Sequence, residues 1–283
     1  MKNLLHPSLI LILIFSMSLG HAQSSRKNKK VIGNGDITTQ TITTSGYDGI
    51  TSLGFIDVEL VNGAEGQINV TTDSNLQEYI EIEVKDNVLK IKTKDRTNLS
   101  TKKGVKVTVP VESISKIQLT GSGNLRSAAV IKANEFKLNV TGSGDAVLAI
   151  EASEVEARIA GSGNIDLSGS FTDLELSVAG SGTFKGTGLS SKSTEVSIAG
   201  SGDVKLSGTT SQLDLKISGS GNFHGFDLNA NQTKVMVAGS GDAQVVAQQD
   251  IYASVVGSGS VVYKGNPDQK EFKKTGTGKI SKQ

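Results

Sequence analysis

The stretch Ile159-Ala160-Gly161-Ser162-Gly163-Asn164 contains one copy of a Gly-Ser-Gly phrase that recurs through more than half of the chain. The first glycines of the Gly-Ser-Gly copies are Gly121, Gly142, Gly161, Gly180, Gly200, Gly219, Gly239 and Gly257, and a Gly-Thr-Gly copy starts at Gly276. Successive copies lie 18 to 21 residues apart. A period this regular predicts that each unit is one structural rung and that the rungs stack.

Apolar residues keep a fixed register relative to each first glycine. They stand two, four and six residues before it, and four and often six residues after it, with polar residues between them. Examples are Phe136, Leu138 and Val140 before a glycine, and Leu125, Ile165, Phe184 and Leu206 after one. This alternation is strand periodicity, and no sustained helical pattern accompanies it. The sequence predicts an all-β fold, a parallel β-helix or β-solenoid with rungs of about 19–20 residues, in which looser segments such as 169–172 complete the rungs.

A column of small polar residues follows three positions after each first glycine. Its members are Asn124, Asp145, Asn164, Thr183, Asp203, Asn222, Asp242 and Ser260. No two aspartates are consecutive, and neighbouring rungs lie ~4.8 Å apart, a distance at which stacked like charges repel. The column therefore predicts a structural ladder in which neutral side chains donate hydrogen bonds to carboxylates.

The chain divides into four segments. Residues 1–22 are predicted to be a signal peptide, because the apolar run 9–19 is short for a bilayer span and Gly20-His21-Ala22 resembles a small-x-small cleavage site. An uncleaved membrane anchor is the alternative. Residues 23–32 are predicted to be a polar, basic linker, 33–114 a less regular β-rich section, and 115–283 the regular solenoid. A lysine-rich C-terminal cap would discourage another strand from adding to the open end.

Composition narrows the function classes. The net charge is +1, which argues against a nucleic-acid partner held by bulk electrostatics. The chain has no cysteine, so disulfides, thiolate nucleophiles and thiolate metal sites are excluded. Aromatic residues make up 4%, with no tryptophan, so the core must be aliphatic. No transmembrane segment is expected once the signal peptide is cleaved.

Several motifs together resemble a known family. They are Tyr47-Asp48-Gly49-Ile50, Ile56-Asp57-Val58-Glu59-Leu60, Asp73-Ser74-Asn75-Leu76 and 84–91, followed by the repeated Gly-Ser-Gly-Asp/Asn. The set resembles the putative auto-transporter adhesin, head GIN domain family, over roughly residues 33–265. The resemblance implies a β-helical, exported protein of the bacterial envelope. The chain lacks a segment with the many long alternating strands of an auto-transporter barrel, so self-translocation is not expected.

One outward column is a candidate binding site. Five residues before the first glycines, Glu156, Glu175, Glu195 and Asp214 occupy four consecutive rungs between Lys137 and Lys234. A second outward column, two residues further on, contains Arg158, Ser177, Ser197 and Lys216. This acidic stripe is either a solvated strand face or a site for a divalent cation or a basic partner.

Catalytic and metal sites are weakly encoded. His224 is the only histidine beyond the predicted leader, and it lies in the glycine-rich stretch Phe223-His224-Gly225, where a catalytic triad is not expected. Calcium-binding β-rolls repeat glycine and aspartate every nine residues, a pattern that this chain lacks. No cofactor and no metal site are expected.

The sequence thus favours a non-enzymatic, adhesin-like interaction protein, exported to the periplasm or the outer cell surface. Its outer solenoid faces would contact a protein or a glycan. A β-helical polysaccharide-active enzyme is one alternative. A structural envelope protein whose copies associate end to end is another, and it would make self-association part of the function.

Overall fold

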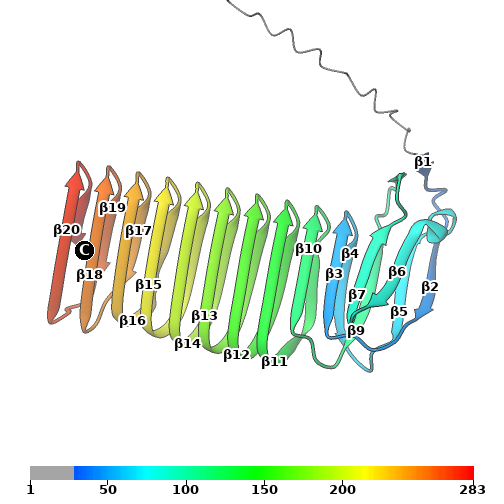
Figure 1. Ribbon diagram of the computed structural model, residues 1–283, viewed down its shortest axis with the longest axis horizontal. Coiled ribbons are helices and arrows are strands. Elements are labelled where there is room, and N and C mark those ends of the chain that lie inside the picture. Colours follow the sequence, from blue (N-terminus) through cyan, green and yellow to red (C-terminus); the bar gives the residue numbers. More distant parts are fainter. Residues whose placement is uncertain (1–28) are drawn as a thin grey trace, which may run out of the picture.

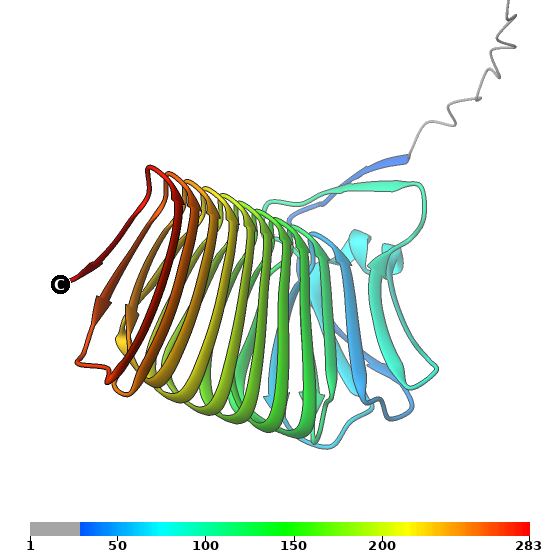
Figure 2. The same ribbon diagram turned by 60° about the vertical axis from the view of Figure 1, so that its left-hand side comes forward.

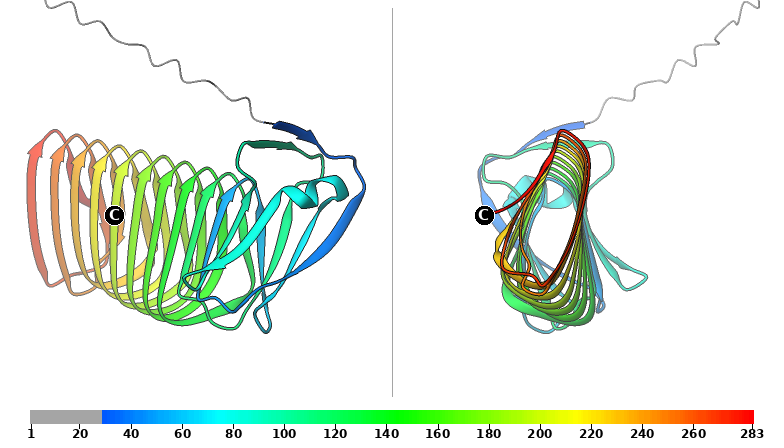
Figure 3. Two further views of the ribbon diagram at one scale, coloured as in Figure 1. Left: turned by 45° about the vertical axis from the view of Figure 1, so that its right-hand side comes forward. Right: turned by 90° about the vertical axis from the view of Figure 1, so that its left-hand side faces the viewer.

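The computed structural model describes residues 29–283, so the predicted signal peptide and residues 23–28 of the predicted linker lie outside the described part. One stack of β-rungs dominates the molecule, with an additional group of strands at its N-terminal end (Figures 1 and 2). Viewed down the stack, the rungs superpose into a flattened ring (Figure 3, right). The predicted all-β fold with a less regular N-terminal section is confirmed.

Long strands form the middle of the stack, and each ends at the first glycine of a corner. They are β11 (Leu125–Gly142), β12 (Asp145–Gly161), β13 (Asn164–Gly180), β14 (Thr183–Gly200), β15 (Asp203–Gly219) and β16 (Asn222–Gly239). Neighbouring strands pair in parallel with their glycines aligned, as in Gly142 with Gly161 and Gly161 with Gly180. The predicted parallel solenoid is confirmed.

The segments expected to be looser lie inside these strands instead. Gly169 is part of β13 and Gly208 is part of β15. The ladder continues through this region with register shifts, for example between Ser168 and Ser170. Bulges and glycines with positive φ let the chain bend there without leaving the sheet.

The C-terminal rungs are built from shorter strands: β17 (Asp242–Val246), β18 (Asp250–Gly257), β19 (Ser260–Lys264), β20 (Gln269–Gly276) and β21 (Lys279–Lys282). Among residues 29–283, the last strand of each series has one neighbour only, since β20 pairs with β18 and β21 with β19. In β20, Lys270 is aligned with buried Ile251 and Lys274 with buried Val255. Two core columns therefore end in lysine at this end of the molecule.

The stack begins earlier than the predicted boundary at residue 115. Strands β3 (Gly49–Gly54) and β4 (Asp57–Asn62) already form a rung, because β3 pairs in parallel with β10 (Lys116–Gly121) and β4 with β11. Gly54 is aligned with Gly121 in this register. Residues 63–115 are an excursion between two adjacent rungs, which hides the repeat in the sequence.

The excursion and the first strands cover the N-terminal end of the stack (Figure 3, left). They comprise β1 (Lys29–Ile32), β2 (Ile37–Thr43), β5 (Gln67–Asp73), the 3-10 helix η1 (Ser74–Tyr79), β6 (Ile80–Lys85), β7 (Val88–Thr93), β8 (Thr97–Ser100) and β9 (Lys106–Val111). β7 and β9 add to β3 and β4 in parallel, whereas β6, β5 and β2 continue the sheets in antiparallel order. β1 pairs with β8 and occupies the last four residues of the segment that we expected to be a linker.

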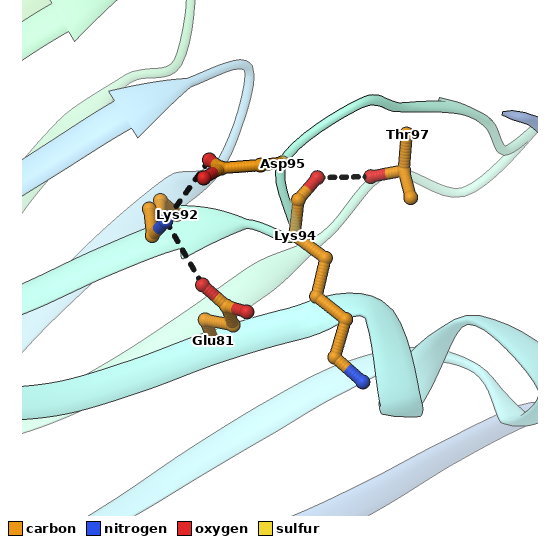
Figure 4. A network of polar contacts seen from close by, with 5 residues as sticks. All are labelled: Glu81, Lys92, Lys94, Asp95 and Thr97. Carbon is orange, nitrogen blue, oxygen red and sulfur yellow. Dashed lines mark hydrogen bonds and ion pairs between the residues drawn. The ribbon is translucent and has the colours of Figure 1, made fainter. Parts of the chain in front are cut away.

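Polar contacts between strands stabilise the N-terminal end of the molecule. Lys92 Nζ on β7 lies 3.0 Å from Glu81 Oε2 on β6 and 3.0 Å from Asp95 Oδ1 (Figure 4). The hydrogen bonds to these two carboxylates raise the pKa of Lys92 above its ordinary value. Tyr47, from the motif that carries the family resemblance, is buried, and its backbone N–H donates to Glu65 Oε2 at 2.8 Å.

The apolar columns fill the interior as predicted. Leu125, Leu167 and Leu206 are fully buried, and Phe136, Phe184 and Phe223 are among the largest buried side chains. Each fully buried side chain of this size contributes about 1.5–3 kcal/mol of transfer free energy, so the apolar columns are the main stabilising feature of the stack. The expectation of a purely aliphatic core was wrong, because phenylalanines such as Phe136, Phe184 and Phe223 are also placed in these inward columns.

Candidate binding face

The corners set the rung spacing because both glycines touch the preceding rung. At the corner of Gly142, Ser143 N–H and Gly144 N–H donate to the carbonyl oxygen of Gly121 at 2.8 and 3.1 Å. Gly142 has φ +113°, and a Cβ on Gly144 would lie 2.2 Å from the carbonyl oxygen of Gly123. A side chain at either position would collide or be strained, so the corner requires glycine.

The corner column forms hydrogen bonds from rung to rung. Asn164 Nδ2 donates to Asp145 Oδ1 at 2.7 Å, and Asn222 Nδ2 donates to Asp203 Oδ1 at 2.9 Å. The aspartate and asparagine side chains also accept from the backbone N–H of the next rung, as Asn124 Oδ1 does from Asp145 N–H at 3.2 Å. Asp242 Oδ1 accepts from the Ser260 hydroxyl at 2.7 Å. No two carboxylates are adjacent in the column, and Asp145, Asp203 and Asp242 each accept a hydrogen bond from an amide or hydroxyl group of the following rung.

The column has one member that the sequence analysis missed. Asp57 Oδ1 accepts from Asn124 Nδ2 at 3.0 Å and from Asn124 N–H at 2.9 Å, so Asp57 is the corner residue of the rung formed by β3 and β4. Its corner reads Gly54-Phe55-Ile56, without the second glycine of the repeat. The available signal was Asp57 standing three residues after a glycine.

The predicted stripe lies on one face of the stack. Glu156 is aligned with Glu175, Glu175 with Glu195, and Glu195 with Asp214. The strands place these side chains outward because the residues on either side of each of them point into the core.

Basic neighbours neutralise most of this stripe. Glu156 contacts Arg158 at 2.6 Å and Lys137 at 3.4 Å, and Arg158 also contacts Glu175 at 3.3 Å. Asp214 lies 3.2 Å from Lys234 and 3.7 Å from Lys216. Within residues 29–283, Glu195 is the one carboxylate of the stripe without an ion pair or a side-chain hydrogen bond.

A second acidic column, which the sequence analysis missed, lies beside the stripe. Glu135 is aligned with Glu154, and Glu154 with Asp173. All three are exposed and have no ion pair or side-chain hydrogen bond among the described residues. They stand seven residues before the first corner glycines, so extending the alternation by one more step would have found them. We call the stripe and this column together the acidic face.

Shallow hollows connect the two columns. One, of about 260 Å³, is lined by six carboxylates: Glu135, Glu154, Glu156, Asp173, Glu175 and Glu195. A second, of about 240 Å³, lies between Arg158 and Lys216, and a third, of about 440 Å³, reaches Tyr252. Glu195 lines all three hollows, so they adjoin one another at this residue, and we call the three together the groove.

The other candidate site residue is isolated. His224 is exposed, and its Nδ1 lies 3.5 Å from Gln244 Oε1 on the next rung. Within residues 29–283, no group of three histidine, aspartate or glutamate side chains is arranged to hold a metal ion. No helix in this part of the chain is long and apolar enough to span a membrane.

These features define a β-solenoid of parallel rungs whose charged side chains gather along an open groove on one outer face. The chain belongs to the family described as "Putative auto-transporter adhesin, head GIN domain", whose model matches residues 46–206 and 195–267. No curated protein matches the chain.

Solved structures share the fold over most of the chain. A crystal structure from Parabacteroides distasonis, called a putative lipid binding protein, is 29% identical with a TM-score of 0.69, and the match covers 90% of this chain and all of that one. A putative adhesin from the same species is 27% identical with a TM-score of 0.69, covering 90% and 100%. A putative adhesin from Parabacteroides merdae, at 24% identity and a TM-score of 0.67, covers 90% and 99% and shows the fold alone.

Proposed function

We propose that the protein is an exported, non-enzymatic, adhesin-like interaction protein of the cell envelope, and that its acidic face binds a partner carrying several positive charges. The observation that carries this proposal is a set of four carboxylates that line one hollow and have no ion pair or side-chain hydrogen bond within residues 29–283: Glu135, Glu154, Asp173 and Glu195. Lys137, which lines the same hollow, is paired with Glu156. Family membership supports the adhesin-like role.

The geometry favours an extended partner. The free carboxylates occupy successive rungs, which are ~4.8 Å apart in a parallel sheet. Charges distributed in this way attract a basic segment that runs along the groove, and they increase its rate of association at low ionic strength. A divalent cation, by contrast, requires carboxylate oxygens that converge within about 2.6 Å of one point.

The alternatives have weaker support. A polysaccharide-active enzyme needs an acid and a base, usually two carboxyl groups, that converge on one bond, whereas the free carboxylates of the acidic face are distributed over four successive rungs. In an end-to-end assembly, the C-terminal rung of one copy would pack against the N-terminal end of the next, and the core columns would continue through β20. Lys270 and Lys274 lie in those columns. Charges at inward positions disfavour this pairing.

An oligolysine peptide is the probe for the acidic face. We expect the purified protein to bind it at low salt, with affinity falling as salt is added. The triple variant Glu154→Gln, Asp173→Asn, Glu195→Gln should lose binding. The matched control Glu83→Gln, Glu112→Gln, Asp268→Asn removes the same charge from exposed positions elsewhere and should retain it. Equal binding by both variants would contradict a localised site.

Calcium is the competing ligand. Calorimetry with calcium chloride should give no binding heat that depends on the stripe. If calcium gives binding heat with the unmodified protein and this heat disappears in the variants Glu175→Gln and Glu195→Gln, the ligand of the acidic face is a divalent cation and not a basic partner.

Location is tested separately. Protease treatment of intact cells, followed by detection of released fragments, distinguishes the outer surface from the periplasm. Recovery of the protein only in the cytoplasmic fraction would contradict export.

A further inference from the structure

The N-terminal end of the molecule has an open sheet edge. β2 pairs with β5 along one side and with no other strand within residues 29–283. Thr44 N–H donates to the carbonyl oxygen of Gly66 at 2.9 Å, and Ser74 N–H donates to that of Asp36 at 2.7 Å. Because hydrogen-bonded and non-bonded pairs alternate in an antiparallel ladder, the even-numbered residues of β2 face β5. The backbone groups of Ile37, Thr39, Thr41 and Thr43 therefore point away from the molecule.

This edge lacks the usual protective features. β2 reads Ile37-Thr-Thr-Gln-Thr-Ile-Thr43, with no charge, proline or glycine, and its burial pattern is almost entirely exposed. Natural sheets protect free edges with lysine, proline, bulges or a covering segment. The opposite end of this chain does so, since β20 has lysine at three of its eight positions. The contrast indicates that the β2 edge is covered by another strand in the functional state.

The composition of β2 fits a second copy of the same strand. We propose that two copies of the chain pair through antiparallel β2 strands around a two-fold axis at Gln40. In this register Thr39 lies opposite Thr41 of the second copy, and Ile37 opposite Thr43. All these residues carry outward-facing backbone groups, so each pair can exchange two N–H···O bonds. In this register every residue of β2 lies opposite a β2 residue of the second copy, and no pair consists of two like charges. A two-fold interface requires such self-complementarity.

The consequence is a head-to-head dimer. The sheet β2–β5–β9–β4 continues through the axis into the second molecule. The two solenoids then extend in opposite directions, each with its acidic face free and its lysine-capped end outermost. This proposal does not depend on the ligand of the acidic face.

The two-fold axis gives a sharp test, because residue 40 meets itself. Sedimentation equilibrium of the purified protein should give twice the mass of one chain. Gln40→Lys and Gln40→Glu should each be monomeric at concentrations where the unmodified protein is dimeric, since each places like charges directly opposite one another. An equimolar mixture of the two variants should recover the dimer, because the opposed charges then attract.

The controls separate this interface from others. Gln248→Lys makes the same change at an exposed position between β17 and β18, outside the proposed interface, and should leave the dimer intact. Circular dichroism of each variant should show unchanged β-structure. A monomer at every concentration, or a dimer that Gln40→Lys leaves unaffected, would overturn the proposal, and a covering strand from a different protein would then be the remaining explanation for the edge.

Discussion

Single residues determine the geometry of this molecule most clearly at the corners. The two glycines of a corner are required for partly different reasons. Gly161 has φ +129°, a conformation that side chains disfavour, and an added Cβ would also lie 2.4 Å from the carbonyl oxygen of Gly142. Gly163 has no such backbone angle, but it lies so close to the preceding corner that an added Cβ would be 2.3 Å from the carbonyl oxygen of Gly144. The second requirement is one of space and cannot be read from a backbone angle.

We therefore predict unequal costs for glycine substitutions. Gly163→Ala should destabilise the protein by about 3 kcal/mol, because the rungs must separate to admit the methyl group. Gly188→Ala should cost about 1–2 kcal/mol, since Gly188 has φ +63° but no atom within 4 Å of the added Cβ. Urea unfolding followed by circular dichroism measures the difference. Equal costs would contradict the steric requirement at Gly163.

A second prediction at this scale concerns Asp73, which is 2% exposed. Thr101 Oγ1 donates to Asp73 Oδ2 at 2.6 Å, and Gly35 N–H donates to Oδ1 at 2.6 Å. The bond from Thr101, followed by that from Gly35, lowers the pKa of Asp73 below its ordinary value.

Because the folded pKa is lowered, the ionised form stabilises the protein above the unfolded pKa of about 3.9, and this contribution is lost as the pH falls through the folded pKa. On acidification below about pH 4, the melting temperature of Asp73→Asn should therefore fall by less than that of the unmodified protein. Glu83, an exposed carboxylate, has no ion pair or side-chain hydrogen bond within residues 29–283, so Glu83→Gln should keep the original pH dependence. Parallel pH profiles for Asp73→Asn and the unmodified protein would contradict the role of Asp73.

At the scale of elements, the last rung differs from all those before it. Lys270 and Lys274 occupy positions that hold Ile251 and Val255 one rung earlier, and Phe272 between them is exposed with its ring 5.6 Å from that of Tyr263. The end of the core is therefore apolar at its centre and charged on both sides. Charges at these positions disfavour the addition of a further rung.

Removing the two charges should open this end. Lys270→Ile with Lys274→Val restores the apolar columns, so we expect the double variant to self-associate through its C-terminal rung, as measured by light scattering. Lys192→Ile with Lys205→Val changes two exposed lysines in the middle of the stack and should not associate in this way. Association of both variants alike would indicate general loss of solubility.

The elements also show what the sequence could and could not predict. The columns of β11 to β16 were predictable because every rung carries the same glycine marker and the same alternation. The rung of β3 and β4 was not, because its corner has Ile56 in place of the second glycine and its neighbour lies beyond the excursion. The antiparallel pairing of β2 with β5 depends on tertiary contacts that no local pattern encodes. The alignment of Glu156, Glu175 and Glu195 follows from the shared register, whereas the ion pairs that Arg158 and Lys234 form with the stripe depend on side-chain reach across rungs.

For the whole molecule, each rung contacts mainly its two neighbours, so rungs behave as exchangeable units. Deleting residues 161–179 joins Ala160 to Gly180, which is aligned with Gly161 in the ladder, and so preserves every column. We expect the shortened protein to fold with the same circular dichroism signature and a lower melting temperature. Deleting residues 161–170 shifts the columns of the following rung and should prevent folding. Equal behaviour of the two deletions would contradict a stack held by register.

The unequal ends of the stack also have a dynamic consequence. β13 is held by a neighbour on each side, whereas β20 and β21 are held on one side only, and the N-terminal end is covered by antiparallel strands. Opening therefore begins at the C-terminus and passes inward one coil at a time. In deuterated water, amide protons should exchange as a front that travels from β21 toward β3, which gives the molecule a fixed direction of unravelling.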